Sequence, residues 1–203
     1  MQTRFLLVRH ATCARTEEVL FGRTLDAPLD ADGRRQARSV AEHLRLESPL
    51  RVESSPRRRA LETARAIAAA ASCRLEIAAS LDELDFGEWS GKSFAELEQD
   101  RAWRHWNENR DHARTPAGAG IRALQRSVGR HLAALAGPCA GATLVLVTHG
   151  EVIRSLVLHC LGAPASDYAR VVIDPASVTR LAVDARGVRL EAVNESVPTP
   201  VQP

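Results

Sequence analysis

The sequence predicts an α/β protein in which a mainly parallel sheet lies between two layers of helices, a three-layer α/β/α sandwich. The first observation is that the apolar runs FLLV at 5–8 and TLVLV at 143–147 are short and continuous, which is typical of strands covered on both faces. The second is that segments with a helical spacing of apolar residues alternate with such runs. The third is that the 203 residues contain no internal repeat and no Gly/Ser-rich linker. We therefore expect one domain over residues 1–203.

Strand and helix patterns alternate through the first part of the chain. Ala37, Val40 and Leu44 recur at the spacing of one helix face, and Asp30 is placed to cap that helix. Pro56 suits the first position of the next helix, because a backbone N–H there would have no partner within the helix. The expected elements are a strand over 5–8, a helix over 33–46, a strand over 51–54, a helix over 56–71 and a strand over 74–77.

The second part of the chain begins with a segment of different character. Residues 92–119 are polar, have weak periodicity and contain Trp103 and Trp106, so we interpret them as an insertion with one or two short helices. The Pro-rich tail is expected to fray from about residue 195. The elements expected after the insertion are a helix over 121–135, a strand over 143–147, a helix over 152–161, a strand over 170–173 and a hairpin of strands over 178–183 and 188–193.

Composition and charge narrow the class of protein. Lysine and arginine number 27 against 25 aspartates and glutamates, so the formal charge is only +2, and no field that attracts nucleic acid or a membrane surface is predicted. The first apolar run is too short for a signal peptide, and no stretch approaches the ~18 apolar residues of a membrane span. We expect a cytoplasmic protein that binds neither nucleic acid nor membrane. The oligomeric state stays open, with a homodimer as one alternative.

Cationic and imidazole side chains follow three of the predicted strands at the point where each strand ends. Arg9 and His10 follow the FLLV strand, His149 follows the TLVLV strand, and three arginines at 57–59 follow the RVES strand. Ligands of open α/β sheets bind beyond the carboxyl ends of the strands. We therefore expect these groups to meet at one edge of the sheet.

The arginines at 57–59 begin a predicted helix, where each positive charge opposes the helix dipole by a few tenths to about 1 kcal/mol. A phosphate bound at that helix end would reverse the balance, because free N–H groups and a guanidinium would both contact it. Successive helical residues point ~100° apart, so we expect one arginine to face the ligand and two to be solvated. Zinc is the rival interpretation for the histidines, but the sequence has no H-x-x-x-H and no Asp or Cys beside either one.

Five segments resemble, in the right order, the motifs of one enzyme family. They are LVRHATC, GRTLDAPLDADGRRQA, SSPRRRALETA, LDELDFGEWSG and VLVTHGEVIRSLV. Their patterns are similar to those of the histidine phosphatase superfamily, the phosphoglycerate mutase-like enzymes. The resemblance implies a phosphoglycerate mutase-like fold and a two-step phosphoryl transfer that needs no metal and no cofactor.

The resemblance also implies a role for individual residues. His10 would be the nucleophile, and Glu83 would protonate the leaving oxygen and then help water to attack phosphohistidine. Glu83 needs a raised pKa for this role, and nearby carboxylates would raise it. Its neighbours Asp82 and Asp85 could equally be surface carboxylates, and the choice of Glu83 rests on the resemblance. The residues expected to bind the phosphate are Arg9, Arg59, His149, Gly150, Thr16 and Gly22. Thr16 stands where the family commonly has an asparagine, so its contact would be weakened or moved.

Three functions remain in view after this comparison of motifs. A phosphatase that hydrolyses a small-molecule phosphomonoester is favoured, because the 92–119 insertion is short and should let water reach phosphohistidine. A mutase of this family typically carries a longer insertion, and a non-catalytic phosphate-binding module would be expected to lose His10 or Glu83. The insertion itself either forms an aromatic, basic wall over the site or packs its tryptophans onto the domain, and the two can coexist.

Overall fold

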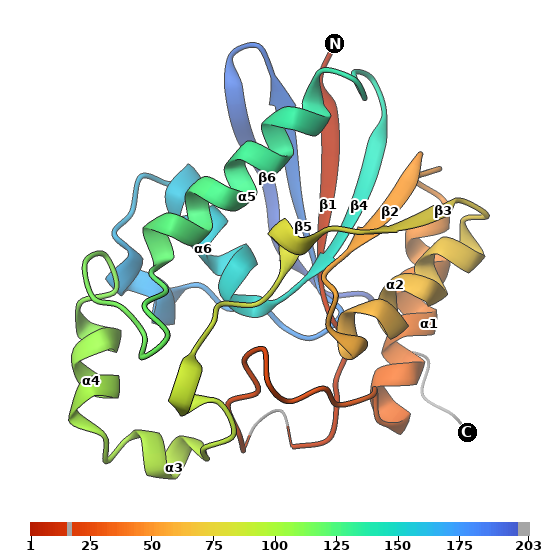
Figure 1. Ribbon diagram of the computed structural model, residues 1–203. Helices are drawn as coiled ribbons and strands as arrows, with labels where there is room; N and C mark the ends of the chain where they lie inside the picture. Colours follow the sequence, from red (N-terminus) through yellow and green to blue (C-terminus); the bar gives the residue numbers. More distant parts are fainter. Residues whose placement is uncertain (16–17, 199–203) are drawn as a thin grey trace.

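The computed structural model describes residues 1–15 and 18–198, and within them six strands form one mixed sheet. They are β1 (Thr3–Arg9), β2 (Arg51–Ser54), β3 (Arg74–Ile77), β4 (Thr143–Thr148), β5 (Val178–Asp184) and β6 (Gly187–Glu195). Their order is β3-β2-β4-β1-β5-β6, in which the first four are parallel and the last two antiparallel (Figure 1). The predicted mainly parallel sheet is therefore confirmed.

Helices cover both faces of the sheet, so the three-layer prediction is also confirmed. The main ones are α1 (Ala31–Arg45), α2 (Arg58–Ala70), α5 (Ile121–Ala136) and α6 (Gly150–Cys160). Figure 1 shows α1 and α2 on one side of the sheet and α5 and α6 on the other. In β1, Phe5 and Leu7 join the core beneath α5 and α6, whereas Leu6 and Val8 join the core beneath α1 and α2. All four are buried, which is the physical reason for the continuous run FLLV.

The helix starts follow local chemistry, with one correction to the sequence prediction. Asp30 caps α1 as expected, because its side chain accepts a hydrogen bond from the Gly33 N–H at 2.7 Å. By contrast, α2 begins at Arg58 and not at Pro56, since Arg57 keeps an extended backbone with φ −71° and ψ 138°.

The strand predicted over 170–173 is wrong. Residues Ala165–Arg170 form the short 3₁₀ helix η3, and the chain after it joins no ladder of the described sheet. The carbonyl of Val171 accepts a hydrogen bond from Arg154, and that of Ile173 accepts one from Arg9. These carbonyls bind arginine side chains where a strand would have offered them to a neighbouring strand.

The 92–119 insertion contains two short helices, α3 (Phe94–Leu97) and α4 (Arg101–Glu108), as the sequence predicted. Figure 1 shows both beyond the end of the sheet at which β1 finishes. Trp103 and Trp106 are buried and belong to the core beneath α5 and α6. The insertion is therefore packed onto the domain through its tryptophans.

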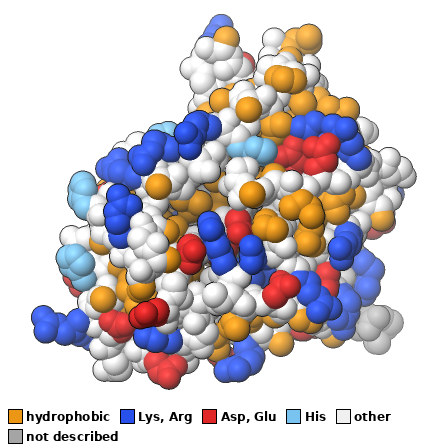
Figure 2. Space-filling model, viewed as in Figure 1, with side chains coloured by type: hydrophobic (Ala, Val, Ile, Leu, Met, Phe, Trp, Pro, Cys, Tyr) orange, Lys and Arg blue, Asp and Glu red, His pale blue; other side chains and the backbone are white. Residues whose placement is uncertain are grey.

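The surface and the chain end complete the description. Figure 2 shows acidic and basic side chains interspersed over one face, with a row of basic ones over α5. Within the described ranges, no helix is both long enough and apolar enough to span a membrane. The tail leaves the sheet after Glu195, and because 199–203 lie outside the described residues, its fraying stays a prediction.

Candidate active site

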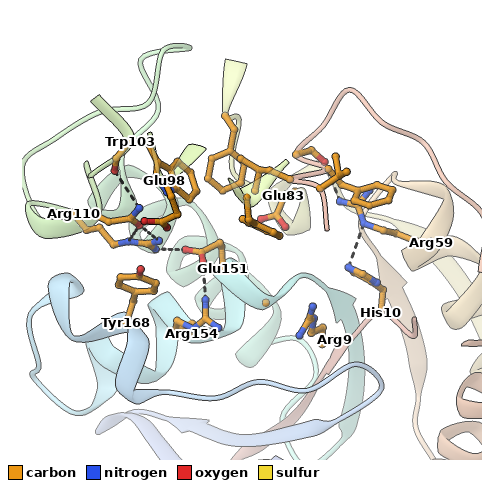
Figure 3. A pocket seen from close by; sticks show the side chains of 18 residues that line it. Arg9, His10, Arg59, Glu83, Glu98, Trp103, Arg110, Glu151, Arg154 and Tyr168 are labelled. Atoms are coloured by element: carbon orange, nitrogen blue, oxygen red, sulfur yellow. Dashed lines mark hydrogen bonds and ion pairs between the residues drawn. The ribbon is translucent and has the colours of Figure 1, made fainter. Parts of the chain in front are cut away.

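One cavity of about 320 Å³ lies at the carboxyl edge of the parallel strands (Figure 3). Most of the site residues predicted from the sequence line it, namely Arg9, His10, Gly22, Arg59, Glu83 and Gly150. His149 is wholly buried and contacts the site through Arg59. Thr16 lies outside the described residues, so its role stays a prediction. The expectation that three strand ends converge on one place is confirmed.

His10 follows β1 and is only 4% exposed. Its Nδ1 lies 2.9 Å from the Ala11 carbonyl, and a carbonyl can only accept, so Nδ1 carries the proton. Nε2 therefore holds a lone pair, which accepts a hydrogen bond from Arg59 Nε at 3.2 Å. Burial, together with the charges of Arg59 and Arg9, lowers the pKa of His10 well below 6.5. The ring is neutral and offers a nucleophilic nitrogen.

Arg59 lies in the first turn of α2, and its side chain is almost wholly buried. Its Nη2 donates to the Gly22 carbonyl at 2.9 Å, and its Nη1 donates to the Leu25 carbonyl at 3.2 Å. Gly22 turns its chain with a φ of +54°, a value that glycine adopts at little cost. These two carbonyls hold the guanidinium between His10 and His149.

Arg9 ends β1 and lies beside the same two histidines. Its Nη1 donates to the Ile173 carbonyl at 2.5 Å. Its Nε is buried and has no hydrogen-bond partner among the described residues. Gly150 lies against it, since a Cβ at that position would be in van der Waals contact with Nε at 3.5 Å. A buried donor without a partner is unusual in a protein and fits an anion bound in the cavity.

His149 occupies the N-cap position of α6, and its wholly buried side chain makes no capping hydrogen bond. Its Nδ1 lies 3.2 Å from Arg59 Nη2, and a guanidinium can only donate, so Nδ1 accepts in the neutral ring. Nε2 then carries the proton and donates to Ser55 Oγ at 2.7 Å. Burial and the charge of Arg59 lower the pKa of His149 well below 6.5. Both histidines are neutral in this arrangement.

Glu83 is the carboxyl that reaches the cavity from the segment after η1 (Ala79–Leu81). Burial raises its pKa to about 7, with Arg59 opposing the rise and the carboxylate of Glu151 adding to it. Its Oε2 lies 3.7 Å from His149 Nδ1. A carboxyl with this pKa can both give and take a proton near neutral pH.

Two side chains next to the cavity differ from their predicted environment. Asp82 is not a surface carboxylate, because it is buried and accepts the Glu83 N–H at 2.8 Å. Arg57 is only partly solvated, since its side chain is 26% exposed and donates twice to Asp82 at 2.8 and 2.9 Å. Arg58 is solvated as expected, with its side chain 54% exposed. The Arg57–Asp82 pair joins residues 25 positions apart, which no local pattern reveals.

The ion pairs at the end of the cavity away from His10 were also not predicted from the sequence. There Glu151 forms ion pairs with Arg110 and Arg154 beside Tyr168 (Figure 3). Residues 92–119 were expected to form an aromatic, basic wall over the site or to pack onto the domain, and Trp103 and Arg110 of this insertion do line the cavity. Among the described side chains, no group of three or more His, Cys, Asp or Glu residues is arranged to hold a metal ion.

A buried neutral histidine, two arginines and a carboxyl with a pKa of about 7 lie together in this cavity, and such a set of groups is suited to phosphoryl transfer. Comparison with known protein families gives the family of the chain. The histidine phosphatase superfamily (branch 1) matches residues 5–196, and the chain belongs to this superfamily. The probable phosphoglycerate mutase GpmB of Enterobacter sp. (strain 638) is 32% identical over 177 residues, which cover 86% of this chain and 82% of that protein.

Solved structures are similar over almost the whole chain. The mycobacterial glucosyl-3-phosphoglycerate phosphatase has a TM-score of 0.83 and 26% identity, and the match covers 97% of this chain and 100% of the other. The phosphoserine phosphatase of Entamoeba histolytica, solved with 3-phosphoglyceric acid, has a TM-score of 0.86 and 25% identity, with 96% and 98% covered. Phosphatases and probable mutases are thus both among the similar proteins.

Proposed function

We propose that this protein is a phosphatase that hydrolyses a small-molecule phosphomonoester through a phosphohistidine on His10, without a metal. The observation that carries the proposal is the hydrogen bonding of His10. Nδ1 is held by the Ala11 carbonyl, so the lone pair of Nε2 is the one available to the cavity, between the guanidinium groups of Arg9 and Arg59. A neutral imidazole in a cationic setting is suited to attack a phosphate dianion.

In the first step, Nε2 of His10 attacks phosphorus as the bond from phosphorus to the ester oxygen breaks. The leaving oxygen takes the proton of Glu83, which is protonated below a pH of about 7. Arg9 and Arg59 stabilise charge on the transferring group, with the buried Nε of Arg9 as one fixed donor. His149 stays neutral in this step, because burial and the charge of Arg59 keep its pKa low, and its Nδ1 accepts a hydrogen bond from Arg59 that holds this guanidinium beside the phosphate.

In the second step, water attacks the phosphorus of phosphohistidine. The Glu83 carboxylate, which lost its proton in the first step, takes one from that water. The bond from phosphorus to Nε2 breaks, phosphate leaves, and both His10 and Glu83 return to their starting states. One carboxyl therefore serves both steps, and a pKa near 7 suits both directions of proton transfer.

A mutase is the second candidate, because curated relatives are named probable phosphoglycerate mutases. A mutase must keep water from phosphohistidine until the second substrate oxygen attacks. The insertion here provides only the four residues of α3 and the eight of α4 over the cavity. This short cover favours hydrolysis over transfer.

The test is hydrolysis of a chromogenic phosphomonoester, with a chelator present, by the wild type and by His10→Ala. We expect wild-type turnover that the chelator does not reduce and that disappears in the variant. Retained turnover in His10→Ala would contradict the assignment of the nucleophile. Conversion of 3-phosphoglycerate into its isomer faster than phosphate release would favour the mutase.

A further inference from the structure

The end of the cavity away from His10 is organised around one carboxylate, Glu151 in the first turn of α6 (Figure 3). Its Oε2 lies 2.5 Å from Arg110 Nη1, and its Oε1 lies 2.7 Å from Arg154 Nη1. Burial would raise the pKa of Glu151, but the two arginines outweigh it and hold that pKa below 4.5. Glu151 is therefore ionised, and both of its oxygens are engaged. We call Glu151, Arg110 and Arg154 the distal cluster.

The two arginines of the distal cluster are fixed by further contacts. Arg110 has a side chain only 3% exposed, and its guanidinium lies between the rings of Trp106 and Tyr168, at 3.9 and 3.3 Å from their centres. Arg154 donates from Nε to the Val171 carbonyl at 2.8 Å. Stacked and hydrogen-bonded arginines of this kind are positioned by the fold. Both arginines are therefore already paired with Glu151 and are not free to bind an anionic ligand.

Charge is divided unequally between the two halves of the cavity. In the reactive half, Arg9 and Arg59 are positive and the two histidines are neutral, which balances a phosphate dianion. In the other half, the distal cluster carries one net positive charge and the carboxylate of Glu98 lines the same space. These formal charges cancel. The site thus balances the phosphate and holds no surplus charge for a second anion.

We propose that Glu151 is a specificity-determining residue that makes this protein prefer phosphomonoesters of uncharged alcohols over those that carry a carboxylate. The inference rests on the proposed phosphatase function and narrows its substrate class. A substrate carboxylate in this half would face the charge of Glu151 and would compete with it for arginines already paired, and like charges brought together cost affinity. An uncharged group can pack instead against aromatic side chains that line the cavity, among them Trp103, Phe86, which packs on it, and Tyr168.

The direct test compares esters that differ only in the carboxylate. One pair is phenyl phosphate and 4-carboxyphenyl phosphate, and the other is glycerol 3-phosphate and 3-phosphoglycerate. We expect kcat/KM of the wild type to be about 10- to 100-fold higher for the uncharged member of each pair. The carboxylate makes the phenol a slightly better leaving group, so leaving-group chemistry alone would give the opposite preference.

Glu151→Gln tests the residue itself. The amide keeps the size of the side chain, removes its charge and leaves Arg110 and Arg154 to bind a substrate carboxylate. We expect the preference for uncharged esters to fall by about tenfold or more, mainly because the carboxylated esters improve. Glu47→Gln is the matched control, since Glu47 also bridges two arginines, Arg4 and Arg180, but does so outside this cavity. It should leave the preference unchanged.

The possible outcomes separate this inference from the function on which it rests. Equal wild-type kcat/KM within each pair would overturn the specificity inference and leave the phosphatase intact. An unchanged preference in a folded Glu151→Gln would overturn the role of Glu151. If that variant does not fold, the wild-type comparison within each pair still tests the preference for uncharged esters. If none of the four esters is hydrolysed in a reaction that requires His10, the proposed function is overturned, and the specificity inference with it.

Discussion

Glu83 links the chemistry of the site to the stability of the fold, because its carboxyl is buried with a pKa of about 7. The ordinary value is 4.5, which is the value expected in the unfolded chain. Between these two values the folded protein retains a proton that the unfolded protein has lost. The free energy of unfolding therefore falls as pH rises through this window. Each unit of difference between the folded and unfolded pKa corresponds to about 1.4 kcal/mol of unfolding free energy. Across the whole window the free energy of unfolding therefore falls by about 3 kcal/mol.

Glu83→Gln removes this titration while keeping the size of the side chain. We expect the wild type to lose about 2 to 3 kcal/mol relative to the variant between pH 5 and pH 8. Urea unfolding of both proteins at the two pH values measures it, because all other titrating groups contribute equally and cancel in the comparison. A difference between the two proteins that does not change with pH would show that Glu83 titrates normally, and the proposed acid and base would lose its physical basis.

Three further changes test other parts of the structure. Arg59→Ala should lower kcat/KM by about 10² to 10³ because the guanidinium would contact the transferring phosphoryl group, whereas the exposed Arg58→Ala should leave it nearly unchanged; equal losses would contradict the placement of the site. His131→Ala should destabilise the fold by about 1 to 3 kcal/mol in urea unfolding, since it removes a 2.6 Å hydrogen bond from the buried Glu53 carboxylate. Gly33→Ala should also lower stability, although alanine favours helices, because its Cβ would collide with a carbonyl of the preceding loop; a gain in melting temperature would refute this.

Much of the fold could be predicted because each strand and helix carries its own periodic signal. FLLV and the LVLV of 144–147 are apolar throughout since helices cover both faces of the sheet. The strand predicted over 170–173 failed for a reason outside that segment. Its carbonyls accept hydrogen bonds from Arg9, 164 positions away, and from Arg154, 17 positions away, and an apolar pattern contains no information about such partners.

The residues of the candidate site also fall into those that the sequence predicted and those that it did not. His10 and His149 follow apolar strands, so their placement at one sheet edge could be predicted from the strands alone. The choice of Arg59 among three neighbouring arginines and of Glu83 among three acidic residues came from the resemblance, and the cavity contains both. Glu151 was missed because its significance depends on Arg110, 41 positions away in the chain. Ion pairs between distant segments form only once the fold brings them together.

The measurement that tests the central claim most directly is the trapping of phosphohistidine. The wild type is mixed briefly with a phosphomonoester, quenched in base to preserve the bond from phosphorus to nitrogen, digested and examined by mass spectrometry. We predict that the peptide containing His10 gains the mass of one phosphoryl group, and that Glu83→Gln, which cannot assist the attacking water, retains it longer. His10→Ala should give no such peptide. Turnover without any phosphorylated His10 peptide, or a phosphoryl group on another residue, would contradict the proposed mechanism.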